Sequence, residues 1–314
     1  MYAIKTIPED FLVEEIFSPP EKEGDYYYII LELNNEETLY AIERLAKKLG
    51  TKSKNIGYGG IKDKRAVTKQ YLSINGVSKE KIESVGFRIV GSDNKSMSLG
   101  DHEGNKFKIV IRNLDEDEVR NLKEKLSKIK GKYKFVNFFG EQRFSSKNID
   151  VGIAILQRDF RNACNLVRHN KIKAHLEKYP SDYTGAFSKL PKKLIMLFVH
   201  AFQSKIWNIL AERFDDEIIP IPGYMTEFKN EEIKKLCENY LSDLDMNFRS
   251  FAIREIPNLF TGGSERERTA IAENFYFSKF ENDELNQGRK KITVSFELKK
   301  SVYATVCIES LLRK

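Results

Sequence analysis

The sequence has few of the residues that build metal sites and disulfide frameworks. Its three cysteines (Cys164, Cys237 and Cys307) are far apart, and its four histidines form no His-Glu-x-x-His pattern. There is no Cys-x-x-Cys pair, so the spacing predicts neither a zinc site nor a disulfide framework. We therefore expect no metal centre and no redox chemistry from the cysteines.

Long apolar runs and targeting signals are also scarce. No apolar stretch approaches the roughly 20 residues needed to span a bilayer. The start, MYAIKTIPEDFLVEE, lacks the basic head and apolar run of a signal peptide. We expect a chain that binds no membrane and stays in the cytosol. Its 314 residues suffice for one large domain or two ordinary ones.

Charge, by contrast, is abundant and unevenly distributed. Lys+Arg number 53 against 46 Asp+Glu, a net charge of +7. Between Lys47 and Asn75 there are eight basic residues and a single acid, Asp63. The eight are Lys47, Lys48, Lys52, Lys54, Lys62, Lys64, Arg65 and Lys69. Such a stretch attracts phosphates and favours nucleic acid as the partner.

The first half of the chain alternates strand-like and helix-like segments. Asn35 is predicted to cap a helix that Gly50 ends, and a second helix is expected at Asp115–Lys130. Dense β-branched and aromatic residues predict strands between them. These strands are Tyr26–Leu33, Ala66–Ile74 and Phe107–Ile111.

From about residue 153 the apolar spacing becomes mainly helical. It predicts one helical face from Leu156 to Val167, a longer helix around Trp207 and another at Ile233–Tyr240. Strand chemistry returns at Ile292–Leu298 and Tyr303–Ile308. Strand-rich ends around a helix-rich middle indicate an α+β domain, 1–152 plus 273–314, interrupted by an inserted domain, 153–272.

The most informative stretch is the loop GYGGIKDKRAVTKQ at 57–70. Its glycines allow unusual backbone dihedrals and close approach of a substrate. Positive neighbours favour the ionised form of Asp63, although this residue could simply pair with Lys62, Lys64 or Arg65. Lys62 follows Ile and precedes Asp, so the loop lacks the Gly-Lys-Ser/Thr pattern of a nucleotide-triphosphate site.

The sequence resembles the TruD family of tRNA pseudouridine synthases in five motifs that occur in the same order. The central one has Gly-x-Lys-Asp, followed by Ala, Thr and Gln at fixed offsets. In this chain these residues are Gly60, Lys62, Asp63, Ala66, Thr68 and Gln70. The other four motifs are residues 5–15, residues 99–107, residues 137–144 and Tyr303-Ala304-Thr305 with Glu309.

The resemblance implies a pseudouridine-synthase-like sheet, mixed but mostly antiparallel and flanked by helices, with an inserted, mainly helical TRUD-type domain. It implies an isomerase that acts on a uridine in tRNA, usually position 13, without a metal or organic cofactor. Such enzymes detach uracil from its ribose, turn it and rejoin it through carbon. Asp63 would supply the catalytic carboxylate, and Lys5 the basic residue that keeps it ionised and aimed.

A target uridine in folded RNA must be flipped out before an enzyme can reach it. By resemblance, Phe11, Asn105, Phe107 and Tyr303 form the pocket for the flipped base, with Phe107 in the stacking position. An amide such as that of Asn105 can donate and accept at once, which suits a pyrimidine edge. Without the motif, Phe11 and Phe107 are more simply interpreted as core residues on strands.

Further contacts to RNA are expected from Lys62 and Arg65 in the loop. Gln142 and Arg143 could hold phosphate or merely brace the end of a strand. Two departures from the family pattern concern the pocket wall: Ser145 replaces a common glycine, and Lys299–Val302 replace Pro-x-Gly-Ser.

Three rival functions stay open at this point. A catalytically inactive RNA-binding protein could use the same basic surface. A nucleotide-dependent enzyme could use the glycine loop, and would then need added nucleotide. A scaffold protein would leave the solitary acid of a basic loop unexplained.

Overall fold

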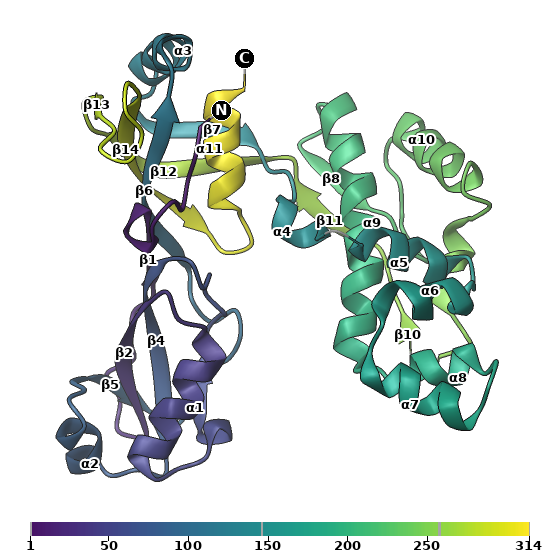
Figure 1. Cartoon of the computed structure of the whole chain (residues 1–314), viewed down its shortest axis with the longest axis horizontal. Helices are drawn as coiled ribbons and strands as arrows, with labels where there is room; N and C mark the ends of the chain where they lie inside the picture. The colour runs from purple at the N-terminus through teal and green to yellow at the C-terminus, as the bar shows by residue number, and fades with distance from the viewer. Residues whose placement is uncertain (1, 146, 257–258, 314) are drawn as a thin grey trace. The chain divides into compact units, whose positions relative to one another are not determined.

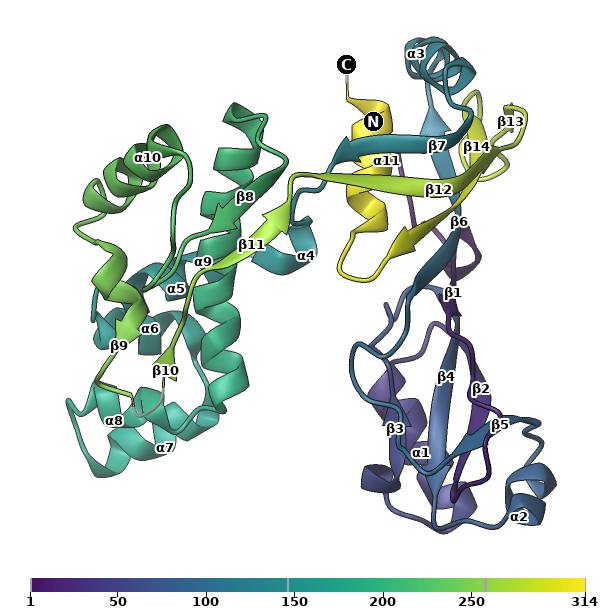
Figure 2. The ribbon, with the colours of Figure 1, turned by 180° about the vertical axis from the view of Figure 1, so that it is seen from behind.

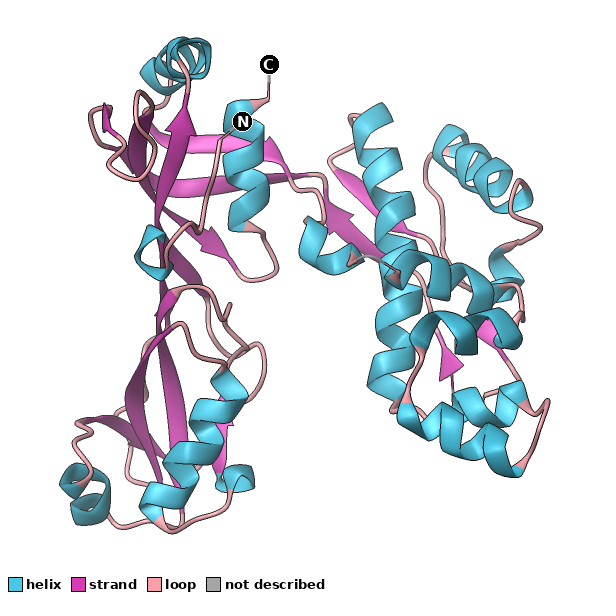
Figure 3. Cartoon of the chain, viewed as in Figure 1, coloured by secondary structure: helices cyan, strands magenta, loops and turns pink. Residues whose placement is uncertain are grey.

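A computed structural model describes residues 2–145, 147–256 and 259–313. The chain divides into two compact units, here called unit 1 (Met1–Phe135 with Ile271–Lys314) and unit 2 (Val136–Ala270). Unit 1 is built on a sheet, whereas unit 2 is mainly helical (Figure 3). The helical unit is therefore an insertion into the sheet unit.

The insertion begins earlier than the predicted boundary between residues 152 and 153. That boundary would cut helix α5 (Asn148–Leu156), whose Val151, Ala154 and Ile155 are buried in the core of unit 2. The return to unit 1 falls at Ala270/Ile271, close to the predicted 272/273. Packing of α5 against α9 (Lys192–Arg213) is what moves the first boundary.

Unit 1 contains one ten-stranded sheet with the order β5-β2-β4-β1-β6-β14-β12-β7, to which β13 and β3 add at β14 and β4. β1 pairs in parallel with β4 and antiparallel with β6. The other registered pairs are antiparallel, so the predicted mixed, mostly antiparallel sheet is confirmed. The strands are β1 (Phe11–Ile16), β2 (Tyr26–Asn34), β3 (Ile56–Tyr58), β4 (Val67–Asn75), β5 (Ile89–Asp93), β6 (Gly104–Leu114), β7 (Gly131–Val136), β12 (Thr269–Phe277), β13 (Glu281–Asn282) and β14 (Lys290–Lys299).

Two helices lie on the same side of this sheet (Figures 1 and 2). Helix α1 (Thr38–Leu49) buries Ile42, Leu45 and Leu49 against β2, β3 and β4. Helix α11 (Ala304–Leu312) lies near β7, where Ser310 donates a hydrogen bond to the hydroxyl of Tyr133. The remaining helices of unit 1 are α2 (Lys79–Ser84), α3 (Glu116–Ser127) and the short 3-10 turns η1 (Pro8–Asp10) and η2 (Ser53–Asn55).

Unit 2 packs around α9, whose Phe198, Phe202 and Trp207 are buried. The expectation that no stretch is long and apolar enough to span a bilayer was wrong for this helix, which by length and composition could cross a membrane. In the folded protein, 61% of its most apolar window is buried. The other elements are α4 (Glu141–Phe144), α6 (Phe160–Val167), α7 (Asn170–Lys178), α8 (Tyr183–Ser188), β8 (Ile218–Ile221), α10 (Glu231–Ser242), η3 (Phe248–Phe251), β9 (Ala252–Ile253), β10 (Leu259–Phe260) and β11 (Ser264–Glu267).

Three local predictions were wrong. Asn35 has φ of 55° and lies before the helix, which is capped at Glu37. The segment predicted as a strand at 303–308 instead caps and begins α11, with Tyr303 as the N-cap, because its apolar side chains are buried with helical spacing. The expected face from Leu156 to Val167 belongs to two helices, separated where the side chain of Asp159 caps α6. The strands at β2, β4 and β6 and the helices α3, α9 and α10 are confirmed.

Candidate active site

Asp63 lies in the loop between β3 and β4, next to Lys62, whose backbone is bonded to the start of α1. The loop is fixed at both ends: the backbone N–H of Lys62 donates to the Thr38 hydroxyl at 3.0 Å, and Ala66 is buried and accepts from the Asn35 N–H. A Cβ at Gly59 would approach Met97 Cε to 2.7 Å, so a larger residue there would require the Met97 side chain to shift. The side chain of Asp63 is 34% exposed and so can be reached from solvent.

Lys5 forms an ion pair with Asp63, as the resemblance implied. Its Nζ is 2.7 Å from Asp63 Oδ2 and 4.1 Å from the centre of the Phe11 ring. The Lys5 ammonium group is thus held between an aromatic face and a carboxylate. The two residues are 58 positions apart in sequence, so only the fold brings them together.

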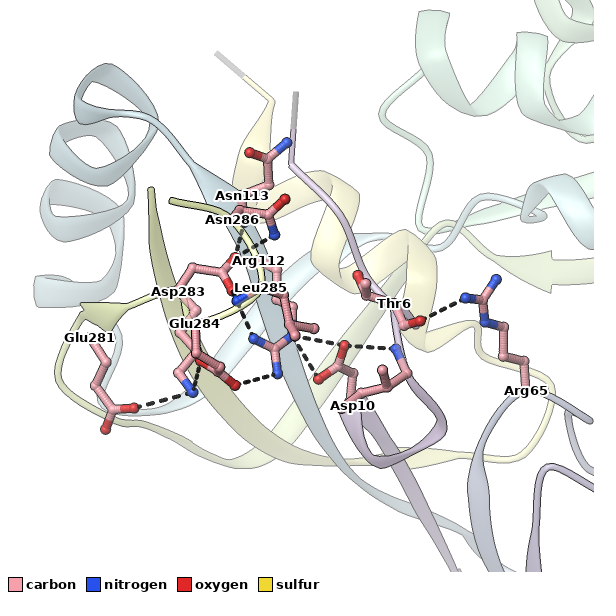
Figure 4. Close-up of polar contacts among 12 residues, drawn as sticks. Thr6, Asp10, Arg65, Arg112, Asn113, Glu281, Asp283, Glu284, Leu285 and Asn286 are labelled. Atoms are coloured by element: carbon pink, nitrogen blue, oxygen red, sulfur yellow. Dashed lines mark hydrogen bonds and ion pairs between the residues drawn. The ribbon is translucent and has the colours of Figure 1, made fainter. Parts of the chain in front are cut away.

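A buried ion cluster holds the segment that carries Lys5 (Figure 4). Arg112 donates from Nε to Asp10 at 2.9 Å and from Nη1 to Asp283 at 2.8 Å, and all three residues are almost fully buried. The backbone of Arg112 also pairs with that of Ala3. Lys5, which has φ of 56°, lies between these two attachment points.

The loop that carries Asp63 also contacts the N-terminal segment that carries Lys5. Arg65 donates to the backbone carbonyl of Thr6 at 2.6 Å (Figure 4). Lys5 is therefore restrained through Ala3, Thr6 and Asp10, and Asp63 through the loop that contains Arg65. Restraint of this kind preorganises a charged pair before any substrate arrives.

A second ion pair, Lys62–Glu15, lies beneath the loop. Lys62 Nζ is 2.6 Å from Glu15 Oε1 and donates to Asn105 Oδ1 at 2.7 Å. The Glu15 side chain is fully buried and that of Lys62 is 7% exposed. The expectation that Lys62 contacts RNA is therefore corrected: its ammonium group points into the protein and is engaged there.

Other cations of the basic stretch are also paired. Lys64 contacts Glu37 at 3.2 Å and Lys69 contacts Glu32 at 2.8 Å. Asp63 is thus the sole acid of its sequence segment but not of its surroundings. Arg65 is exposed, which is compatible with the predicted contact to RNA.

Three of the four predicted pocket residues, Phe11, Asn105 and Phe107, share one face of the sheet. Val13 is in register with Phe107, and Glu15 with Asn105. Phe11 packs edge-on against Phe107 at 6.0 Å between ring centres. Phe107 is only 7% exposed, so the ring offers little surface to a base in this state, and the aromatic pair also serves as core.

Tyr303 lies at the same end of the sheet by register. It precedes α11 and follows β14, whose last residue Lys299 pairs with Gly104, next to Asn105. Gln142 and Arg143 belong to α4 in unit 2. Arg143 donates to the Ser204 hydroxyl at 3.1 Å, which supports the structural alternative for this residue.

Two further residues near the loop were not anticipated as site residues. Glu15 belongs to the matched motif at residues 5–15. Phe11, Val13 and Glu15 alternate on the buried face of β1, and this alternation could have indicated that Glu15 is buried. His102 lies within hydrogen-bond distance of the Gly59 carbonyl at 3.1 Å. Burial and the Lys62 ammonium lower the pKa of His102, so the neutral imidazole donates from Nδ1 to that carbonyl.

The described residues contain no cluster of three or more His, Cys, Asp or Glu that could hold a metal ion. The three cysteines are buried and free. Burial raises the pKa of Cys164 to about 11 and that of Cys237 to about 12, so neither is a reactive thiolate.

A family model described as "tRNA pseudouridine synthase D (TruD)" matches residues 2–174, 166–219 and 216–311. "Probable tRNA pseudouridine synthase D" of Methanosarcina acetivorans is 30% identical over 405 aligned positions, which cover 97% of this chain and 91% of the relative. "tRNA pseudouridine synthase D" of Leptospira interrogans is 26% identical and covers 99% and 96%. The alignments are longer than this chain, so the relatives contain segments that it lacks.

A solved structure is similar over the same extent. The crystal structure of "Putative tRNA pseudouridine synthase D (TruD) from Methanosarcina mazei" has a TM-score of 0.75 and 26% identity, covering 98% of this chain and 93% of that one. Sequence and fold thus agree from one end of the chain to the other, through both units. The chain belongs to the TruD family of tRNA pseudouridine synthases, which are isomerases.

Proposed function

We propose that this protein converts a uridine in tRNA, position 13, to pseudouridine with Asp63 as its catalytic carboxylate. The observation that carries the proposal is the Lys5–Asp63 ion pair, 2.7 Å long and one-third open to solvent on the Asp63 side. It lies on the loop where the family motif has its aspartate. Around it, the sheet face presents Phe11, Asn105 and Phe107.

One carboxylate is sufficient for the reaction. The bond from uracil N1 to ribose C1′ breaks, the ring turns, and a bond from C5 to C1′ forms. The proton on C5 is released and N1 gains one, so no atom is gained or lost. Asp63 can add to the ribose or remove a proton from it while uracil leaves as a stabilised anion. A hydrolase would need a second carboxylate across the bond.

The role of Lys5 in this proposal is electrostatic. Its ammonium group contacts Asp63 Oδ2 and so fixes which carboxylate oxygen faces the sugar. The anchors at Ala3, Thr6 and Asp10 limit movement of Lys5 while the base turns. Positioning of this kind lowers the barrier because the site does not reorganise during the reaction.

Phe107 is proposed as the stacking residue for the flipped base, and Tyr303 as part of the pocket wall. Phe107 is largely buried between Phe11 and Phe296. A flipped base can therefore contact only the small part of the Phe107 ring that stays exposed. Arg65 is proposed to contact the RNA backbone. Such contacts make tRNA affinity fall steeply as salt rises.

The decisive experiment maps pseudouridines in unmodified tRNA after incubation with wild-type protein and with Asp63→Asn. We expect one new pseudouridine, at position 13, from the wild type and none from the variant. Asp25→Asn, which removes an exposed carboxylate of the same unit outside the family motifs, is the matched control and should leave the product unchanged. An inactive RNA-binding protein would bind tRNA and yield no product from any of the three proteins.

A further inference from the structure

A chain of three polar side chains crosses the sheet face beside Asp63. Glu15 on β1 accepts the backbone N–H of Tyr71 through Oε2 at 2.9 Å and contacts Lys62 Nζ through Oε1 at 2.6 Å. The same ammonium group donates to Asn105 Oδ1 at 2.7 Å. Glu15 and Asn105 are in register on neighbouring strands, so Lys62 spans a pair that the backbone itself holds together.

This arrangement fixes the direction of the Asn105 amide. A lysine ammonium has three donors and no acceptor, so the atom of Asn105 that faces it must be the carbonyl oxygen. The amide nitrogen is then turned away from Lys62. Among the residues that the structure describes, none accepts a hydrogen bond from this nitrogen, and Asn105 is only partly buried.

The charge of Lys62 is compensated at the same time. An unpaired ammonium with 7% exposure would be costly, and a buried carboxylate alone equally so. Paired with Glu15, Lys62 adds no net charge next to Asp63 and is not available to phosphate. What remains for it is to orient Asn105.

We propose that Glu15 and Lys62 are positioning residues that present the Asn105 amide to the base as a hydrogen-bond donor only, so that the pocket selects uracil over cytosine. This inference rests on the proposed function. Uracil carries carbonyl oxygens at both C2 and C4, and either can accept from the Asn105 N–H group. Cytosine has an amino group at C4, which is a donor and meets the amide nitrogen unfavourably.

A fixed N–H donor on Asn105 is also compatible with the rotation of the uracil ring during the reaction. Pseudouridine forms when C5 takes the place of N1, which corresponds to rotation about the axis through N3 and C6. That rotation exchanges the two carbonyl oxygens of uracil. A fixed donor therefore finds an acceptor before and after the turn. In cytosine the rotation would exchange a carbonyl with an amino group, so one of the two positions is always mismatched.

Asn105→Asp tests the donor role directly. An aspartate keeps an oxygen toward Lys62 and replaces the donating nitrogen with a second acceptor. We expect kcat/KM for pseudouridine formation to fall on the order of 10- to 100-fold, the loss typical of a buried hydrogen bond whose partner becomes an acceptor. Asn121→Asp, on the exposed face of α3, makes the same change of charge and should behave like the wild type.

Base preference gives the second readout. Two tRNA transcripts that differ only by uridine or cytidine at the mapped target position compete for wild-type and variant protein. The wild type should prefer the uridine transcript, and Asn105→Asp should lose or reverse that preference because its carboxylate can accept from the cytosine amino group. Wild-type turnover and preference in Asn105→Asp would show that Asn105 only holds Lys62, and would overturn the proposal.

The positioning pair is tested by Glu15→Gln with Lys62→Met in one protein. This double variant removes both charges but keeps an acceptor for the Tyr71 N–H, so it should fold with a similar melting temperature. We expect its preference for uridine to fall, and Lys62→Arg alone to retain it. An unchanged preference in the folded double variant contradicts the role of the pair. Failure of the proposed function is seen separately, as wild-type protein that makes no pseudouridine.

Discussion

The two units bury different kinds of side chain. Among the described residues of unit 1, the buried polar groups include four charged ones: Asp10, Glu15, Arg112 and Asp283. Those of unit 2 are neutral: Asn137, Gln203, Ser204 and Thr261. The interior of unit 2 is otherwise one large apolar cluster around α9. Unit 1 thus uses buried charge to hold side chains in place, while unit 2 is stabilised by apolar burial.

This difference predicts where mutations separate stability from activity. Breaking a buried ion pair is strongly destabilising because it leaves a charge without a partner. Removing a partly exposed pair costs little stability. Unit 1 contains both a buried ion cluster around Arg112 and the partly exposed Lys5–Asp63 pair. Mutations in unit 1 can therefore change folding stability and activity independently.

The largest effect on stability is expected for Arg112→Met. The change leaves Asp10 and Asp283 buried without their cation and should lower the free energy of unfolding by about 3–5 kcal/mol. Arg120→Met, which removes an exposed arginine paired with Asp117, should cost less than about 1 kcal/mol. Urea unfolding followed by far-UV circular dichroism measures both. Equal stability of the two variants would refute the importance of the cluster.

Phe202→Ala provides the matching perturbation of unit 2. It opens a cavity beside Tyr240 and Phe251 and should cost about 3–5 kcal/mol. Trp207 is the only tryptophan of the chain and is buried in unit 2, so its fluorescence follows that unit. We expect Phe202→Ala to shift the fluorescence transition more than Arg112→Met does. Identical shifts from both variants would show that the units unfold as one.

Lys5→Met should affect activity far more than stability. Loss of the cation beside Asp63 is expected to lower kcat about 10²- to 10³-fold, the range seen when one preorganised electrostatic contact is removed. The unfolding free energy should change by less than about 1 kcal/mol, because the pair is partly exposed. Lys5→Arg should recover part of the activity. A Lys5→Met protein with normal turnover would remove Lys5 from the reaction.

The smallest expected effect is on the pH dependence of folding stability. Each unit contains one histidine with a lowered pKa, His102 in unit 1 and His200 in unit 2. Burial and Lys62 lower the pKa of His102, and burial and Arg143 lower that of His200. Protonation then favours the unfolded chain, whose histidines titrate near about 6.5. Stability should be full above that pH and decline as pH falls through the lowered pKa values. His102→Gln should flatten the decline seen by circular dichroism, and His200→Gln that seen by Trp207 fluorescence.

Much of the sheet and the Lys5–Asp63 pair could be predicted from the sequence. Strands such as β2 and β4 have dense β-branched and aromatic residues, and the α3 cap is a local pattern of Asp115 with Glu118. The pairing of Lys5 with Asp63 came from the order of family motifs. Local chemistry alone cannot identify a partner that lies 58 residues away.

The engagement of Lys62 could not be predicted from its neighbours. Its sequence context is a basic loop, which suggests an exposed cation, yet its partners Glu15 and Asn105 come from two other strands. The helix after Tyr303 was missed for a related reason. Thr305, Val306 and Ile308 have strand propensity, and only packing on the sheet decides for a helix. Tertiary contacts outweighed local preference in both cases.

The strand order has a consequence for synthesis on the ribosome. β6 pairs with β1 on one side and with β14 on the other, and β14 is translated only after all of unit 2. Unit 2 can therefore complete its core while β6 still has an open edge. An open edge invites pairing with other chains. Lys106 and Lys108 are exposed at alternate positions along β6. Such lysines discourage aggregation until β14 has been synthesised and pairs with β6.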